Sequence, residues 1–140
     1  MVTLLIGKKG TGKTKKLISL ANEAVAASTG NVVVIEKGSK LTYDVTHKAR
    51  LIDTEQYLIS GYDMLFGFIS GICAGNYDVT DILVDSTFKI CPEALAGLET
   101  FNKEASGSCR NCIKLTLFSL FLLMKAKFRS QSMLFAEKYN

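Results

Sequence analysis

The chain has 140 residues, a formal net charge of +4, one proline and 48% hydrophobic residues. That length and apolar content suffice for one folded domain that buries about two-thirds of its unfolded surface, and they exclude an intrinsically disordered chain. We therefore expect a single domain over residues 1–140.

A phosphate-binding motif follows the first predicted strand. Val2–Ile6 is a short apolar run, and the octet GKKGTGKT follows it directly. The octet fits G-x-x-x-x-G-K-[ST], the P-loop pattern, in which backbone N–H groups surround phosphate oxygens. The alternative is a Gly/Lys-rich surface turn that matches by chance, but the motif needs a strand before it and a helix after it, and the sequence predicts both. The predicted nucleotide-binding residues are Gly7, Lys8, Lys9, Gly10, Thr11, Gly12, Lys13, Thr14 and Lys15.

Each residue type in the motif has a chemical reason. The glycines allow a tight turn with no Cβ between the backbone and the phosphates. Lys13 would place an ammonium on the β- and γ-phosphates, which makes it a predicted catalytic residue as well as a binding residue. The Thr14 hydroxyl would ligate Mg²⁺, and the helix that follows would direct its positive N-terminal end at the same anion.

The next segments predict a helix, a buried strand and a loop. Apolar residues recur at three- and four-residue spacing over residues 14–27, which predicts a helix. Val32–Ile35 is a continuous β-branched run, typical of a strand buried on both faces of a parallel sheet, and Glu36 ends it. Residues 37–47 are polar and predict a loop, and residues 49–53 predict a short strand.

A second helix is predicted over residues 62–74, with Asp63 or Ser60 at its start and Gly75-Asn76 at its end. Three glycines recur at four-residue spacing in this region: Gly67, Gly71 and Gly75. The apolar run is too short and too interrupted to span a membrane. We therefore expect the glycines to allow close packing of the helix on a sheet.

The second half of the chain continues the alternation of strands and helices. Ile82–Val84 predicts a buried strand that ends at Asp85. Residues 93–105 predict a helix after Pro92, and residues 113–123 predict a last strand. This order predicts an α/β fold, a mostly parallel β-sheet with helices on both faces, and with the motif a P-loop NTPase fold. Ligands of such folds bind at the carboxyl ends of the strands.

Asp85 is the second candidate position. An aspartate after three large apolar residues is typical of a Walker B strand, and it would hold Mg²⁺ through water or contact Thr14. The alternative is an aspartate that caps the following turn. Many P-loop ATPases place a glutamate directly after this aspartate to orient the attacking water, but here Ser86-Thr87 follows.

The pair Asp85-Ser86, together with Glu36 at the end of the second strand, resembles the RecA-like ATPases. In those enzymes a glutamate at the tip of a neighbouring strand acts as the base. The resemblance implies that Glu36 is the catalytic residue that activates water. The alternative is an exposed strand-end carboxylate that pairs with Lys37 or Lys40.

Residues 1–104 also resemble a family of small P-loop proteins from Gram-positive anaerobic bacteria, sometimes labelled ATP-binding or twitching-motility-like proteins. The resemblance rests on the segments GKKGTGKTKKL, GNVVVIEKGSKLTYDV, ARLIDTEQY and GYDMLFGFISGICAGNYDVTDILVDSTFKI. It implies nucleotide binding, with ATP and Mg²⁺ as the cofactors, rather than one particular reaction.

The tail over residues 105–140 departs from that family. It carries 6 Lys/Arg and 1 Asp/Glu, whereas residues 1–104 carry 11 and 12. In the family the last strand precedes an acidic helix that begins with proline. Residues 122–132 can be encoded so that a shifted reading frame gives ADESKVPESV, so we hypothesise a compensated frameshift in this segment. The alternative is a buried strand followed by a basic surface helix.

Cysteine usage and charge bear on location and partners. Four cysteines at irregular spacing predict free thiols in a reducing cytosol, and no basic region precedes an apolar stretch after Met1, so we expect a cytoplasmic protein. Cys109-x-x-Cys112 has the spacing of half a zinc site but lacks a second pair. The basic tail does not by itself indicate a nucleic-acid partner, and a protein partner or a homo-oligomer stays open.

Three functions are compatible with this sequence. The first is an Mg²⁺-dependent ATPase of RecA-like type, a hydrolase. The second is a nucleotide-binding switch or partner module with little turnover, which the missing glutamate after Asp85 favours. The third is a small-molecule kinase. It is disfavoured because such enzymes usually neutralise the transferred phosphoryl group with several arginines, and residues 1–104 contain only Arg50.

Overall fold

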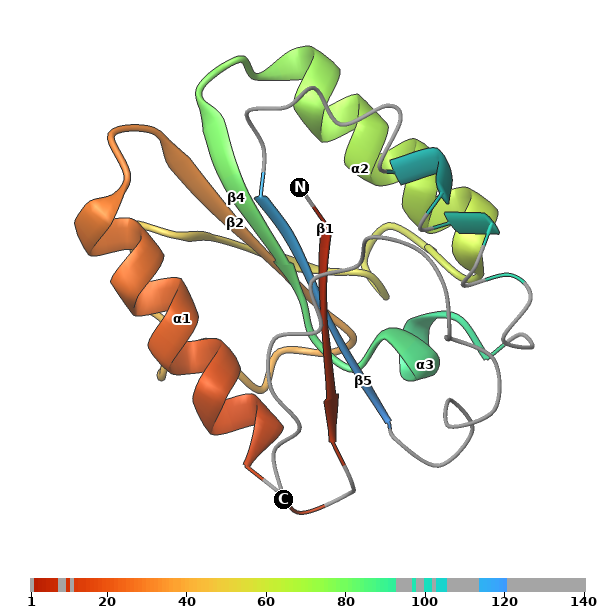
Figure 1. Cartoon of the computed structure of the whole chain (residues 1–140), viewed down its shortest axis with the longest axis horizontal. Helices are drawn as coiled ribbons and strands as arrows, with labels where there is room; N and C mark the ends of the chain where they lie inside the picture. The colour runs from red at the N-terminus through yellow and green to blue at the C-terminus, as the bar shows by residue number, and fades with distance from the viewer. Residues whose placement is uncertain are drawn as a thin grey trace.

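A five-stranded parallel sheet organises the protein (Figure 1). The computed structural model describes residues 2–7, 10, 12–92, 97, 100–101, 103–105 and 114–120. The strands are β1 Val2–Gly7, β2 Asn31–Glu36, β3 Arg50–Asp53, β4 Val79–Val84 and β5 Lys114–Leu120, in the order β1-β5-β4-β2-β3. The helices are α1 Lys13–Ala27, α2 Tyr62–Gly75 and the short α3 Thr87–Ile90. All described strand pairings are parallel.

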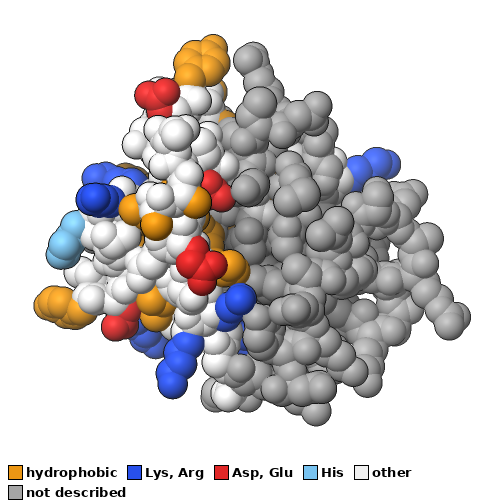
Figure 2. Space-filling model, turned by 60° about the vertical axis from the view of Figure 1, so that its left-hand side comes forward, with side chains coloured by type: hydrophobic (Ala, Val, Ile, Leu, Met, Phe, Trp, Pro, Cys, Tyr) orange, Lys and Arg blue, Asp and Glu red, His pale blue; other side chains and the backbone are white. Residues whose placement is uncertain are grey.

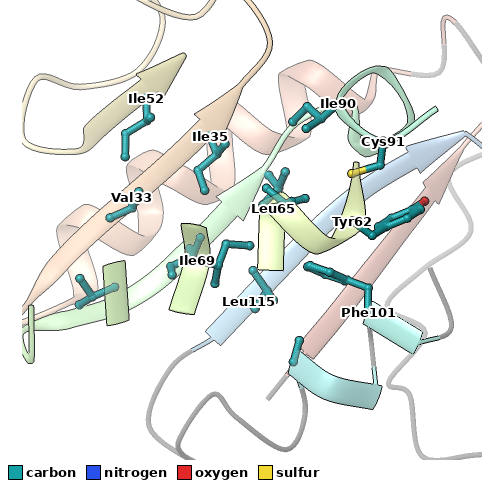
Figure 3. Packing of buried hydrophobic residues seen from close by; sticks show 14 residues of the cluster. Val33, Ile35, Ile52, Tyr62, Leu65, Ile69, Ile90, Cys91, Phe101 and Leu115 are labelled. Atoms are coloured by element: carbon teal, nitrogen blue, oxygen red, sulfur yellow. The ribbon is translucent and has the colours of Figure 1, made fainter. Parts of the chain in front are cut away.

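The sheet is covered by a helix on each face. Along β2 the side chains alternate, so that Val32 and Val34 pack with α1, whereas Val33 and Ile35 pack with α2. Figure 3 shows the second of these clusters, in which Leu65 of α2 is directed at the strands. The continuous apolar run of β2 therefore has the cause expected from the sequence, since both of its faces are buried. The predicted α/β architecture, with a parallel sheet and helices on both faces, is confirmed.

The start of α2 differs from the prediction. Gly61, with φ 89° and ψ 161°, is the N-cap residue, and no side chain caps the helix, while Asp63 lies in the first turn. The Gly61 N–H donates to the carbonyl oxygen of Ile90 at 3.0 Å, and this bond fixes how the chain enters the helix. A positive φ of this kind suits a residue without Cβ. Neither Asp63 nor Ser60 is therefore the cap.

The glycines of α2 do not pack on the sheet, so that prediction is wrong. Gly67, Gly71 and Gly75 are exposed, and a Cβ added at any of them would meet nothing within 4 Å. The face that packs on the sheet is the one that carries Leu65 and Ile69, and the glycines lie on the other side of the helix. None of the described helices, α2 included, is long and apolar enough to cross a membrane.

Two elements of the second half of the chain lie close to the predicted ranges. The last predicted strand is β5, and it lies between β1 and β4. Within the predicted helix over residues 93–105, the described residues are helical, and Phe101 packs near Tyr62 with ring centroids 5.8 Å apart. The sequence did not predict α3. Residues 121–140, which include the whole hypothesised frameshifted segment over residues 122–132, lie outside the described residues.

Glycine substitutions test this packing, because two glycines of the chain have opposite surroundings. A Cβ at Gly30 would overlap the carbonyl oxygen of Asp78 and lie 2.7 Å from Thr80 Cγ2. We expect Gly30→Ala to lower the free energy of unfolding by about 1–3 kcal/mol, the usual effect of overpacking. Gly71→Ala is the matched control and should raise it by about 1 kcal/mol, because alanine favours an exposed helical position. Urea unfolding measures both, and equal effects of the two substitutions would contradict the packing described.

Candidate functional site

The candidate residues lie at one edge of the sheet, because the carboxyl ends of parallel strands share an edge (Figure 1). Gly7 ends β1, Glu36 ends β2, and Asp85 follows β4 directly. Since β2 pairs with β4, the last two residues lie on neighbouring strand ends. The N–H of Asp85 donates to the carbonyl oxygen of Ile35 at 2.8 Å, so the hydrogen bonding between β2 and β4 extends to this edge.

The segment between β1 and α1 turns through two left-handed glycines. Gly10 has φ 81° and Gly12 has φ 83°, a region in which side chains with a Cβ are strained. Gly12 is the N-cap of α1, and its carbonyl oxygen accepts the first helical hydrogen bond from the N–H of Lys16 at 3.0 Å. Three residues of the predicted motif lie outside the described residues: Lys8, Lys9 and Thr11.

The start of α1 is suited to an anion. No side chain caps this helix and no acidic residue lies in its first turn, where Lys13, Lys15 and Lys16 stand instead. Cations at the positive end of a helix are unfavourable by about 0.3–1 kcal/mol each. A bound anion would reverse that effect, since it would lie near both the lysines and the N–H groups of the first turn. Thr14 and Lys15 are exposed, and Lys13 is half-buried.

Lys13 and Asp85 lie within electrostatic range of each other. Burial lowers the pKa of the Lys13 ammonium below its ordinary value, and the negative charge of Asp85 opposes that shift. The start of α1 and the end of β4 therefore lie near each other in the fold. The sequence separates the two residues by 71 intervening residues, and their joint binding of a ligand stays a prediction.

Glu36 is buried, with only 2% of its surface exposed. Its Oε2 accepts a hydrogen bond from the N–H of Lys40 at 3.2 Å, and its Oε1 accepts one from the N–H of Leu41 at 3.1 Å. Burial raises the pKa of the Glu36 carboxyl, the two N–H groups oppose this, and the charges of Asp85 and Asp53 add to the increase. The alternative of an exposed carboxylate paired with a lysine is wrong, because the partners are backbone amides. The proposed role of Glu36 as base stays a prediction.

Asp53 is a neighbour of the site that sequence reasoning did not single out. Its Oδ1 accepts hydrogen bonds from the N–H of Gly38 at 2.8 Å and from the N–H of Glu55 at 2.9 Å. The carboxylate thus ties the loop after β2 to the turn after β3. The available signal was a carboxylate at the end of a short predicted strand, in the same position relative to its strand as Glu36.

The turn after Asp85 is strained. Ser86 has φ 50° and ψ 50°, which is uncommon for a residue other than glycine, and it precedes the short helix α3. The hydroxyl of Thr87 is fully buried and has no hydrogen-bond partner among the described atoms. Strained backbone and orphaned polar groups of this kind concentrate at functional sites.

The described residues offer no ready-made metal cage. Among them, no three His, Cys, Asp or Glu residues are placed so that they could hold one ion. Mg²⁺ is usually held by one or two carboxylates together with water and substrate phosphates, so the predicted Mg²⁺ site does not require such a group. Asp85 and the Thr14 hydroxyl are the residues that would hold such an ion.

Comparison with protein families and with curated proteins finds no match. What the structure itself defines is an α/β protein with an open parallel sheet, whose glycine turn, lysine-rich helix start and acidic strand ends share one edge.

Proposed function

We propose that the protein adopts a P-loop NTPase fold and that it binds and hydrolyses ATP with Mg²⁺. The observation that carries this proposal is that Lys13, at the start of α1 and directly after two left-handed glycines, lies within electrostatic range of Asp85. A phosphate group needs backbone N–H donors and a cation, and the ion that accompanies it needs a carboxylate. All three types of group lie at this edge of the sheet.

The roles of the residues follow from their chemistry. The N–H groups of the first turn of α1 and the Lys13 ammonium bind the β- and γ-phosphates. Thr14 and Asp85 hold Mg²⁺, which neutralises charge on the phosphates when bound. Glu36, on the strand next to Asp85, polarises the attacking water, as in the RecA-like ATPases that this part of the chain resembles.

A second candidate is a nucleotide-binding switch with little turnover. The observation that favours it is the environment of Glu36, whose two oxygens already accept hydrogen bonds from Lys40 and Leu41. Hydrogen bonds from two amides stabilise the charged carboxylate, and this weakens it as a base. The two candidates share nucleotide binding and differ in phosphate release, so a hydrolysis assay separates them.

The binding step is tested by Asp85→Asn, which removes a charge at the strand end and little volume. A fluorescent ATP analogue is titrated into each protein with and without Mg²⁺. For the wild type we expect Mg²⁺ to strengthen binding, and for Asp85→Asn we expect most of this strengthening to be lost, because the ion loses its carboxylate. Asp78→Asn is the matched control, since Asp78 is an exposed aspartate just before β4, at the opposite edge of the sheet. An equal Mg²⁺ response in wild type and Asp85→Asn would indicate that Asp85 only caps the turn after β4 and does not hold the ion.

A further inference from the structure

The segment between β2 and β3, residues 37–49, is packed against α1 along one side. Its buried side chains recur at four-residue spacing and belong to one cluster with Leu17 of α1: Leu41, Val45 and Ala49. The N–H of Val45 donates to the carbonyl oxygen of Leu41 at 3.1 Å, and the N–H of Ala49 donates to that of Thr46 at 3.0 Å, so the segment forms two successive turns. One side of these turns is therefore fixed to the helix, and most residues between the buried positions are exposed.

Hydrogen bonds from other elements hold this segment as well. Near its beginning, the N–H of Lys40 donates to Glu36 Oε2 at 3.2 Å. In its middle, Asn22 Nδ2 of α1 donates to the carbonyl oxygen of Asp44 at 3.4 Å, and Asn22 Oδ1 accepts a hydrogen bond from the N–H of Thr46 at 3.0 Å. A segment that is held at several points loses little conformational freedom when it binds a partner.

On this fixed segment the side chain of Tyr43 is 96% exposed. Leu41 and Val45, two residues before and after it, are buried, so the exposure of Tyr43 follows from the direction of its side chain and not from a detached loop. A tyrosine ring offers a large and rigid contact area, and its binding costs little side-chain entropy. Tyr43 is therefore suited to contact with a partner.

The charged side chains of the same segment are mainly basic. Asp44 is the one acidic residue within residues 38–50, and the same range carries three exposed cations: Lys40, Lys48 and Arg50. Figure 2 shows basic, histidine and apolar side chains next to one another at the left margin of the side on which α1 lies. Lys40, Tyr43, Lys48 and Arg50 together are called the Tyr43 surface below.

We propose that the Tyr43 surface binds single-stranded nucleic acid. A base stacks on the exposed ring of Tyr43, and the three cations bind phosphates of the neighbouring nucleotides. Stacking needs an unpaired base whose face is accessible, so the surface favours single strands over a duplex. Every base has such a face, and we therefore expect little sequence preference.

The centre of this surface is distant from the phosphate motif, and the proposal does not depend on ATP hydrolysis. Asn22, which holds the middle of the segment, lies nine residues after Lys13 on α1, about 14 Å along the helix axis. Binding of nucleic acid can thus be measured without nucleotide, and its failure would leave the proposed function untouched.

Fluorescence anisotropy of a labelled oligothymidylate, measured on the full chain without nucleotide, tests the proposal. We expect Tyr43→Ala to weaken binding by roughly 5- to 150-fold, the usual effect of removing one base–aromatic stack. Tyr43→Phe keeps the ring and should keep the affinity. Tyr77→Ala is the matched control, because Tyr77 is 84% exposed but lies just before β4, at the edge of the sheet where the strands begin.

Salt and charge provide a second measurement. Contacts of three cations with phosphates predict that the logarithm of the affinity falls with the logarithm of the salt concentration with a slope of about −2, and Arg50→Ala should reduce that slope by about 0.7. Asp44→Asn should strengthen binding by roughly two- to fivefold, because it removes the acidic side chain next to Tyr43 in the segment.

Three results would exclude a stacking site at Tyr43 and overturn the proposal: no binding at low salt, equal losses in Tyr43→Ala and Tyr77→Ala, or tighter binding of a duplex than of the single strand. Polyglutamate is added as a competitor in a parallel titration. If it displaces the labelled strand as efficiently as unlabelled oligothymidylate does, charge alone explains the binding. The Tyr43 surface would then fit an acidic protein partner, and the proposal would be wrong.

Discussion

Replacing Glu36 by glutamine is expected to slow ATP hydrolysis by about 10²–10⁴, the usual contribution of a positioned general base. Glutamine has nearly the same shape and cannot take a proton, so the affinity for ATP should stay within a few-fold of the wild type. The effect is measured in single-turnover assays, which separate the chemical step from nucleotide binding and product release. The substitution should therefore slow hydrolysis while leaving ATP binding nearly unchanged.

Glu23→Gln is the matched control for that experiment. Glu23 is an exposed glutamate on α1 whose Oε1 accepts a hydrogen bond from Ser19 at 2.6 Å, and its replacement should leave hydrolysis unchanged. Robust hydrolysis by the wild type that Glu36→Gln does not slow would reject Glu36 as the base and keep the enzyme. Tight binding without hydrolysis in either protein would instead favour the nucleotide-binding switch.

Replacing Lys13 by alanine is expected to weaken ATP binding by about 1.5–3 kcal/mol, which corresponds to roughly 10- to 150-fold in affinity. The physical reason is the loss of a charge-assisted hydrogen bond to the phosphates, at a helix start where Asp85 stands opposite. Lys48→Ala is the control, because Lys48 is exposed in the segment before β3. Titration of a fluorescent nucleotide measures both variants. Unchanged affinity of a folded Lys13→Ala protein would remove the phosphate-binding assignment.

Much of the fold was predictable because strong local patterns agreed with the topology. The continuous run in β2 predicted a strand buried on both faces, and Val32 to Ile35 indeed pack alternately against α1 and α2. The three- and four-residue spacing predicted α1 to within one residue at its start. The P-loop pattern also placed the change from strand to helix, because its glycines allow a conformation that other residues disfavour.

What the sequence could not predict depends on long-range contacts. The cap of α2 is Gly61, and its conformation is fixed by a bond to Ile90 rather than by a neighbouring side chain. The glycines of α2 had a spacing compatible with packing, but which face of a largely apolar helix meets the sheet is decided in three dimensions. The burial of Glu36 likewise depends on how residues 37–46 fold back over the end of β2, and no local sequence pattern predicts that contact.

The position of β5 in the sheet has a consequence for the order in which the strands pair during folding. In the described sheet β1 is an edge strand that pairs with β5 alone, so Val2 meets Leu115. During synthesis β2, β3 and β4 can pair with one another and be covered by α1 and α2, while β1 still lacks its neighbour. Pairings between distant parts of a chain form late, because the intervening loop must first be closed. Among the described strands β1 is synthesised first, yet it is thus among the last to be fixed in the sheet.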